Sequence, residues 1–284
     1  MSQIMTSASF DVFGPLIPLS PVILSVPHAG RDYPEAGGLL RHPIDGLRAL
    51  EDRYADRLAE TVIAGGIGAI VSRMPRLWID LNRAESDLDP AMVIGQHGGG
   101  VPPTARMRGG LGLIPRRLGE LGDIWRGGLS QEDVRRRIDG HHRPYHAALS
   151  TMLSRARARF GVAMLVDLHS MPPLVGTDKP VIVLGDRFGA TCAPQLSVLA
   201  GSVFVGGGYD VGANAPYAGG YIVSRHADLA ANIHALQVEV DRSLYLDDAF
   251  DRTGAGLPAL QAIIARLVES LAARLTSPTQ IAAE

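Results

Sequence analysis

Short apolar, β-branched runs alternate along the chain with longer stretches of helical periodicity. The runs predict strands at residues 21–26, 69–72, 77–80, 162–167, 180–184, 202–205 and 232–241. Apolar positions three and four residues apart predict helices at residues 47–63, 130–158, 186–200 and 256–275. Strand and helix alternate from end to end, which favours an α/β fold. We expect a three-layer α/β/α sandwich with a mixed, mostly parallel central sheet.

Two features interrupt this pattern. Residues 88–128 are rich in Gly, Pro and Arg, and we interpret them as an irregular insertion, because loops of that length are usually functional or mobile. Pro144 is predicted to interrupt the helix that Ser130 caps at its N-terminus. The expected organisation is one domain over residues 1–284 that carries this insertion.

Composition and charge exclude several classes of protein. The 284 residues are 46% hydrophobic and 20% charged, which is ordinary globular composition and not that of a disordered chain. The formal net charge of −2 provides no field to attract a nucleic acid. The single cysteine, Cys192, excludes an internal disulfide and a thiolate zinc cage. Because no apolar run approaches a membrane span and no signal peptide is evident, we expect a cytoplasmic protein without membrane contacts.

Polar residues follow three of the predicted strands directly. His28 follows residues 21–26, Asp167 and His169 follow the apolar run at 162–166, and Asn82 with Arg83 follows residues 77–80. In open α/β sheets ligands bind beyond the carboxyl ends of strands. A histidine with a carboxylate behind it is typical of a metal site, and an Asn–Arg pair suits a substrate carboxylate. Each site alone also fits a turn residue, a helix cap or an ordinary salt bridge.

Carboxylates elsewhere could complete such a site. Asp52 and Asp56 are four residues apart and share a face of the predicted helix at 47–63, although Asp56 could simply pair with a neighbouring arginine. Glu239 lies within an apolar strand pattern, where burial is costly unless the group is paired or functional. Together these residues could form a mononuclear zinc hydrolase, in which the metal activates water and a glutamate transfers its proton.

Eight stretches, in this order, resemble the N-formylglutamate amidohydrolase family, which is itself similar to the zinc carboxypeptidase and aspartoacylase group. They are VPHAG (26–30), EDRYADRL (51–58), SRMPRLWIDLNR (72–83), HRPYHAAL (142–149), VDLHS (166–170), GDRFG (185–189), and GGYIVSRH with ALQVEVDRSLYLDD (219–226 and 235–248). The resemblance implies a zinc-exopeptidase-like fold and hydrolysis of an N-acyl amino acid, in the type member N-formyl-L-glutamate to formate and glutamate. It also implies a place in histidine degradation.

The resemblance implies roles for individual residues. The metal, Zn²⁺ or another divalent ion, would be held by His28, Asp52 and His169, with Asp56, Glu51 and Asp32 as rivals for the acidic ligand. Glu239 would be the general base, and Asn82 with Arg83 would bind the substrate carboxylate. Further candidates for catalytic, substrate or oxyanion contacts are Arg143, Arg73, Tyr145, His146, Arg225 and His226.

Two other functions remain open at this point. A degenerate family member could bind an acidic amino acid or peptide without turnover, and the metal content of the purified protein separates that hypothesis from the enzyme. A serine hydrolase using Ser170 is disfavoured, because Asp167-Leu168-His169-Ser170 lacks the Gly-x-Ser-x-Gly elbow. In each case the expected partner is a small molecule.

Overall fold

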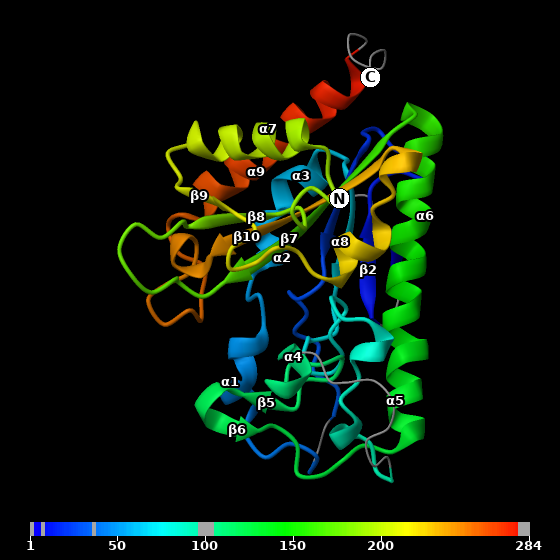
Figure 1. Ribbon diagram of the computed structural model, residues 1–284, viewed down its shortest axis with the longest axis vertical. Coiled ribbons are helices and arrows are strands. Elements are labelled where there is room, and N and C mark those ends of the chain that lie inside the picture. The colour runs from blue at the N-terminus through cyan, green and yellow to red at the C-terminus, as the bar shows by residue number, and fades with distance from the viewer. Residues whose placement is uncertain (1–2, 7–8, 36–37, 96–104, 278–284) are drawn as a thin grey trace.

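The computed structural model describes residues 3–6, 9–35, 38–95 and 105–277, and its centre is an eight-stranded sheet (Figure 1). The strands lie in the order β1 (Gln3–Thr6), β2 (Phe10–Phe13), β4 (Gly68–Ser72), β3 (Val22–Val26), β7 (Ala163–Met171), β10 (Ile233–Asp241), β8 (Ile182–Gly185) and β9 (Val211–Ala213). The four central strands β4, β3, β7 and β10 are parallel, whereas β2 and β8 run antiparallel to their neighbours β4 and β10. The predicted mixed, mostly parallel sheet is therefore confirmed.

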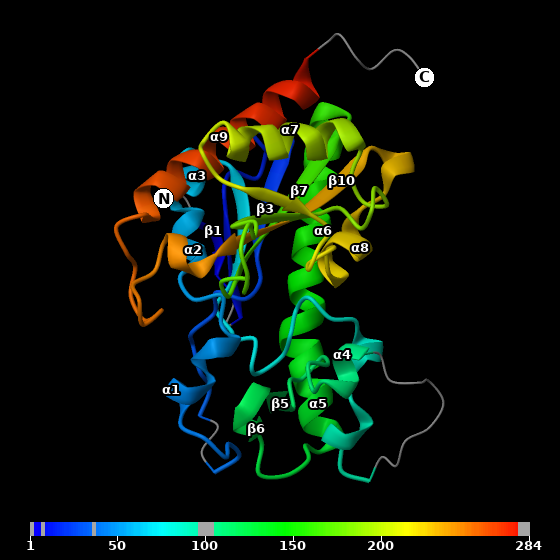
Figure 2. The same ribbon diagram turned by 60° about the vertical axis from the view of Figure 1, so that its left-hand side comes forward.

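Helices cover both faces of this sheet (Figures 1 and 2). On one face, α6 (Arg143–Phe160) and α8 (Tyr221–His226) pack in one apolar cluster with Ile23 and Leu165. On the other face, α2 (Ala55–Leu58), α3 (Glu60–Ala64), α7 (Pro194–Val205) and α9 (Leu257–Thr276) pack on the alternate strand residues, such as Leu24 and Val238. These three layers confirm the predicted α/β/α sandwich.

A smaller lobe lies beyond the carboxyl ends of the central strands (Figure 2). It contains α1 (Ile44–Leu47), α4 (Ala105–Arg108), α5 (Gln131–Arg137) and the two-stranded pair β5 (Arg117–Leu118) and β6 (Gly122–Asp123). Leu47, Met92, Ile114 and Trp125 belong to the separate hydrophobic core of this lobe. The segment predicted as an irregular insertion thus has short elements and shares this core with residues outside it, and residues 96–104 lie outside the described residues.

Several single-turn elements connect these layers. They are the 3₁₀ turns η1 (Arg48–Leu50), η2 (Glu85–Asp87), η3 (Pro90–Met92), η4 (Gly119–Leu121), η6 (Leu229–Ala231) and η7 (Arg242–Leu244), and the π-helical turn η5 (Ile138–His142). The η5 turn joins α5 to α6 beside Pro144, so the predicted interruption of this long helix is confirmed. Ser130 caps α5 by accepting a hydrogen bond from the Asp133 backbone N–H, as expected.

Four predicted elements are wrong in part. The helix predicted at 186–200 begins only at Pro194, because residues 186–193 form turns before α7. The helix at 47–63 is broken between η1 and α2, where Tyr54 adopts a left-handed conformation with φ of 58°. Residues 77–80 form an irregular turn and not a strand. The Asp80 backbone N–H donates to the carbonyl oxygen of Leu113, which belongs to no strand, so no sheet ladder forms here. Residues 202–205 form the last turn of α7, whose Val203 and Phe204 pack into the core.

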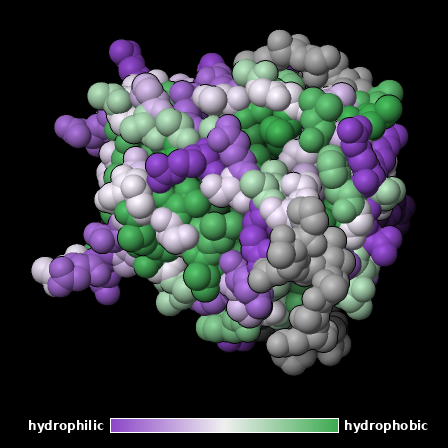
Figure 3. Space-filling view, turned by 90° about the horizontal axis from the view of Figure 1, so that it is seen from above, coloured by the Kyte–Doolittle hydropathy of each residue, from purple (hydrophilic) through white to green (hydrophobic). Residues whose placement is uncertain are grey.

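The outer end of the sandwich carries α7 and α9. Helix α7 has no charged residue, and its Val198 and Val205 side chains are exposed. Figure 3 views the molecule from this end, where hydrophobic and hydrophilic side chains both reach the surface. Over the described residues, none of the helices combines the length and the apolar character that a bilayer crossing requires.

Candidate metal centre

His28 directly follows β3 and is buried at the carboxyl end of the sheet. Its carbonyl oxygen accepts a hydrogen bond from the Asp52 backbone N–H at 3.0 Å. Its Nε2 lies 2.7 Å from Oδ1 of Asp80, and because a carboxylate only accepts, Nε2 carries the hydrogen. The other ring nitrogen, Nδ1, faces Oδ2 of Asp52 at 3.5 Å.

Asp52 reaches this point because the chain leaves helical geometry between η1 and α2. The break turns its carboxylate away from Asp56, so the shared helix face predicted for these two residues does not exist. Oδ2 of Asp52 faces the rings of His28 and His169, while Oδ1 accepts a hydrogen bond from Nη2 of Arg242 at 3.2 Å.

His169 lies within β7, two residues after Asp167 and on the same face of the strand. Its Nε2 lies 2.8 Å from Oδ2 of Asp167, and its Nδ1 lies 2.9 Å from Oδ2 of Asp52. Asp167 is itself fixed by a 2.7 Å hydrogen bond from the Ser25 hydroxyl. The carboxylate behind the imidazole that the sequence suggested is therefore present.

The three rivals for the acidic ligand lie elsewhere. Asp56 forms a two-point ion pair with Arg31, Glu51 accepts from Tyr33 and Arg53, and Asp32 pairs with Arg73. Within the described ranges, His28, Asp52 and His169 form the one His, Cys, Asp and Glu group whose donor atoms could hold a metal ion. Of the acidic candidates, Asp52 is the one that the structure brings to the two histidines.

This group fits a divalent metal. One donor atom from each residue lies within 4.8 Å of the others, and Nδ1 of His28 has no hydrogen-bond partner among the described residues although it is buried. Two imidazole nitrogens and a carboxylate oxygen are a donor set typical of zinc enzymes, and a carboxylate on the far nitrogen of each ring is the usual support. The structure has both supports, Asp80 and Asp167.

Contacts within the group favour ionised carboxylates and a protonated His169. Burial opposes ionisation of Asp52, but contacts with the His169 and His28 rings outweigh it, so the pKa of Asp52 lies well below its ordinary value. For Asp80 the same burial is outweighed chiefly by Arg76 and His28, and its pKa is also well below the ordinary value. Burial lowers the pKa of His169, but Asp167 and Asp52 outweigh that effect and raise it well above the usual range.

Glu239 lies on β10 directly beside His169 in the parallel register of β10 and β7. Oε1 of Glu239 accepts a 2.8 Å hydrogen bond from Nε2 of Gln237, whose own Oε1 accepts from the Gly220 backbone N–H. Burial, reinforced by the charge of Asp52 and opposed by His169, raises the pKa of Glu239 to about 7. A carboxylate with that pKa can accept and return a proton near neutral pH.

A cavity of about 290 Å³ opens over these residues. Its lining comprises His28, Ala49, Leu50, Asp52, Arg76, Asn82, Arg83, Leu111, Leu118, His169, Ser170, Met171, Pro172, Tyr217, Gly220, Gln237, Glu239 and Arg242. The predicted metal ligands, Glu239 and the Asn82–Arg83 pair therefore share one cavity. The small lobe contributes Leu111 and Leu118 to its wall.

The three cavity arginines differ in what their nitrogens contact. All three nitrogens of Arg242 donate to protein, to Ser170, Ala49 and Asp52. Arg83 donates to the carbonyl oxygens of Leu111 and Asn82. Arg76 donates from Nε to Asp80 at 2.8 Å, whereas neither of its terminal nitrogens has a hydrogen-bond partner among the described residues. The fork that faces the cavity without a protein acceptor is therefore that of Arg76.

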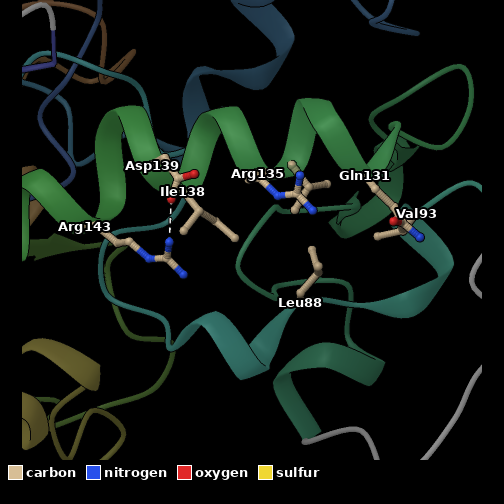
Figure 4. Close-up of a pocket in the computed structure, with 8 residues that line it drawn as sticks. Leu88, Val93, Gln131, Arg135, Ile138, Asp139 and Arg143 are labelled. Carbon is tan, nitrogen blue, oxygen red and sulfur yellow. Dashed lines mark hydrogen bonds and ion pairs between the residues drawn. The ribbon is translucent and has the colours of Figure 1, made fainter.

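Three arginines named from the sequence do not line this cavity. Arg73 is half-buried and paired with Asp32, and Arg225 is exposed and donates to the Tyr221 hydroxyl. Arg143 is exposed and paired with Glu85 and Asp139. Figure 4 shows Arg143 at the edge of a different cavity, of about 260 Å³, which residues of α5 and η5 also line. Each of these guanidinium groups is held by a surface partner, which directs it away from the metal centre.

Three further candidates lie behind the cavity wall. The Tyr145 hydroxyl contacts Ser25 at 2.9 Å, and Nδ1 of His146 lies 2.9 Å from Nε2 of His226. All three side chains are buried, and none lines the cavity. Their contacts are with residues that support the centre and not with the cavity itself.

Sequence reasoning missed four residues that shape the site: Asp80, Arg76, Gln237 and Arg242. Asp80 and Arg76 lie in the SRMPRLWIDLNR stretch, of which only the last two residues and Arg73 drew attention. Gln237 precedes Glu239 by two residues and therefore shares its face of β10. Arg242 follows β10 directly, so the rule that polar residues after strands line the crevice could have identified it.

Comparisons with known proteins agree with this geometry. The sequence model of the N-formylglutamate amidohydrolase family matches residues 20–246. An N-formylglutamate deformylase from Pseudomonas putida is 31% identical over 239 residues, which cover 80% of this chain and 82% of that protein. Another, from Pseudomonas aeruginosa, is 29% identical over 266 residues, covering 89% of this chain and 93% of that protein.

Solved structures share the fold. The crystal structure of an N-formylglutamate amidohydrolase from Ralstonia eutropha superposes with a TM-score of 0.86 and 32% identity, covering 95% of this chain and 99% of that one. A protein from Agrobacterium tumefaciens has the same fold, with a TM-score of 0.66 and 20% identity over 94% of this chain and 93% of the other. Because the family model spans most of the sequence, the chain belongs to the N-formylglutamate amidohydrolase family.

Proposed function

We propose that this chain hydrolyses the amide bond of N-formyl-L-glutamate, releasing formate and glutamate, with a divalent metal, Zn²⁺ in the first instance, as its cofactor. The observation that carries the proposal is the convergence of His28, Asp52 and His169 on one point, with the far nitrogen of each imidazole held by its own buried carboxylate. The names of the relatives support the choice of substrate.

Nδ1 of His28, Oδ2 of Asp52 and Nδ1 of His169 would hold the metal. When bound, such a metal supplies Lewis acidity, which allows water to lose a proton near neutral pH and polarises a carbonyl. Asp80 and Asp167 keep the two imidazoles oriented, and Arg242 keeps the second oxygen of Asp52 out of the centre. The donors are therefore arranged before the metal arrives.

Glu239 is the proton carrier in this proposal. It takes a proton from the attacking water as the new C–O bond forms at the formyl carbon. It then delivers that proton to the glutamate nitrogen as the C–N bond breaks. Gln237 fixes Glu239 for both steps through the 2.8 Å hydrogen bond to Oε1.

Arg76 and Arg83 are the proposed sites for substrate carboxylates. A guanidinium fork binds a carboxylate through two parallel hydrogen bonds, and Arg76 presents its terminal nitrogens to the cavity. The aliphatic part of the substrate would contact Leu50, Leu111 and Leu118. Because the lobe provides two of these leucines, we propose that residues 1–284 work as one catalytic unit.

The test is turnover of a panel of N-formyl, N-acetyl and N-carbamoyl amino acids, with and without a chelator. We expect N-formyl-L-glutamate to be the best substrate and a chelator to abolish its hydrolysis, with recovery on addition of Zn²⁺. Turnover that is insensitive to complete metal removal would exclude this mechanism and return attention to Ser170. A metal-loaded protein that binds glutamate without hydrolysing any of the panel would instead be a degenerate family member.

A further inference from the structure

A row of polar side chains on η5 and α6 faces the segment that carries Asn82. His142, His146 and Ser150 are each four residues apart, so they lie on one face of η5 and α6. The two histidines belong to the HRPYHAAL stretch, and Ser150 is the next residue. None of the three takes a direct part in the proposed reaction. Helix α8, which carries His226, lies beside this face (Figure 1).

The contacts of this row fix one consistent set of tautomers. Nε2 of His146 lies 3.0 Å from the Leu81 carbonyl oxygen, and since a carbonyl only accepts, Nε2 carries the hydrogen. Nδ1 of a neutral His146 ring must then accept, and Nε2 of His226 donates to it at 2.9 Å. Nδ1 of His226 is left to accept from the Ser150 hydroxyl at 3.3 Å.

His142 makes the matching contact two residues further along the segment. Its Nε2 lies 2.8 Å from the Arg83 carbonyl oxygen, which again requires the hydrogen on Nε2. The backbone carbonyls on both sides of Asn82 are therefore held by imidazole donors. Burial keeps these rings uncharged, since it lowers the pKa of His146 to about 2 and that of His226 to about 4.

Asn82 links this segment to Glu239 through Gln237. Its Oδ1 accepts from the Ile222 backbone N–H at 2.8 Å, and its Nδ2 donates to Oε1 of Gln237 at 3.3 Å. Gln237 in turn holds Glu239. The fit is tight, because a Cβ atom on Gly220 would lie 2.3 Å from the Asn82 amide. A shift of the segment at 81–83 would therefore move Asn82, Gln237 and Glu239 together.

We infer that His142 and His146 are positioning residues, whose hydrogen bonds to the Arg83 and Leu81 carbonyls hold Asn82 and Arg83 in the geometry that orients Glu239 and the substrate. This inference rests on the proposed function, because it is the reaction that requires that geometry. Neither histidine touches the cavity, so the effect is transmitted through the backbone.

The first test compares His146→Leu with His146→Gln. Glutamine offers a donor and an acceptor where the imidazole had them, whereas leucine offers neither. We expect His146→Leu to lower kcat/KM roughly tenfold or more at temperatures well below its melting point, with metal content unchanged, and His146→Gln to recover most of that loss. The inference would be overturned if kcat/KM of His146→Leu equalled that of the wild type, or if kcat/KM of His146→Gln were as low as that of His146→Leu.

His141 provides a matched control in the same turn. Its Nδ1 contacts the Ser9 hydroxyl at 2.7 Å and not the segment at 81–83. We expect His141→Leu and His141→Gln to keep the wild-type kcat/KM. A loss in these controls as large as in His146→Leu would show that any lesion in this turn has the same effect, and would overturn the specific role.

The second test needs no turnover and no mutant. In protein labelled with ¹⁵N-histidine, long-range proton–nitrogen correlations report which ring nitrogen carries hydrogen. We expect His146, His226 and His142 to be neutral with the hydrogen on Nε2 at pH 7. A charged His146, or its hydrogen on Nδ1, contradicts the inference even if the protein hydrolyses N-formyl-L-glutamate. If the tautomers are as expected but the protein does not hydrolyse N-formyl-L-glutamate, the proposed substrate is wrong and the positions of the histidine hydrogens still stand.

Discussion

Nδ1 of His169 lies 2.9 Å from Oδ2 of Asp52, although the two residues are 117 positions apart in the chain. Neither side chain is free to turn, because Asp167 holds the far nitrogen of His169 and Arg242 holds the far oxygen of Asp52. His28 completes the group in the same way through Asp80. Each candidate ligand is thus fixed by a separate partner, which is how preorganised metal centres are usually built.

Removal of a ligand is expected to release the metal without unfolding the protein. For His169→Ala we expect loss of bound zinc and of activity together, since two donors seldom hold zinc tightly. Metal analysis of the purified variant, with circular dichroism to verify folding, checks this. His234→Ala, on the same sheet but at the opposite end of β10, should keep its metal. Normal zinc content in His169→Ala would exclude His169 as a ligand.

Glu239→Gln should separate proton transfer from metal binding. The amide keeps the size of the side chain but cannot take a proton, so we expect kcat to fall by roughly 10²- to 10⁴-fold while zinc content stays at the wild-type level. Steady-state kinetics and metal analysis on the same preparation measure both. Glu132→Gln, exposed on α5, is the matched control and should retain full activity. An active Glu239→Gln enzyme would assign the proton transfer to another group.

Arg76 and Arg73 form a matched pair, three residues apart. Arg76 lines the cavity, whereas Arg73 lies outside it and is paired with Asp32. Loss of a two-point contact with a carboxylate is expected to raise the KM of Arg76→Met by about tenfold to a hundredfold, whereas Arg73→Met should leave KM unchanged. A KM that responds to Arg73 and not to Arg76 would reverse these assignments and favour the expectation from sequence.

The buried histidines behind the cavity should make stability depend on pH. Burial lowers the pKa of His226 to about 4 from the ordinary 6.5, so below pH 6.5 the unfolded chain binds a proton that the folded chain does not. This difference in proton binding adds about 3 kcal/mol to the unfolding free energy above pH 6.5. The added stability is lost as the pH falls towards 4.

Urea unfolding of the wild type and His226→Gln between pH 4 and 7.5 measures this contribution. We expect the difference in unfolding free energy between the two proteins to change with pH over that range, with the wild type losing more on acidification. Parallel curves for the two proteins would show that His226 is protonated in the folded state as readily as in the unfolded one.

The two histidines could be found from sequence because each follows an apolar run, and the carboxyl ends of parallel strands meet at one edge of the sheet. The three layers of the sandwich could also be predicted, because the spacing of apolar residues within each segment distinguishes strands from helices. Asp52 was named from the family resemblance, and the structure brings it to the two histidines, but the helix face that it was expected to share with Asp56 does not exist. Asp52 reaches the histidines because Tyr54 breaks the helix, and no pattern of apolar residues signals such a break.

Arg76 shows why the rest could not be predicted. The residues from Arg73 to Arg83 look like a strand followed by polar residues, yet they form an irregular turn whose shape depends on Leu113 and on the histidines of η5 and α6. These distant contacts place Arg76 and Arg83 in the cavity wall and leave Arg73 outside it. The core of the small lobe likewise joins Leu47 to Trp125, which lie in segments far apart in sequence.

The most direct measurement of the central claim is an anomalous difference map, collected at the zinc absorption edge from crystals grown with Zn²⁺. The account predicts one strong peak within bonding distance of Nδ1 of His28, Nδ1 of His169 and a carboxylate oxygen of Asp52. A fully zinc-loaded, active protein whose peak lies elsewhere, with these three side chains still in contact only with one another, would contradict it.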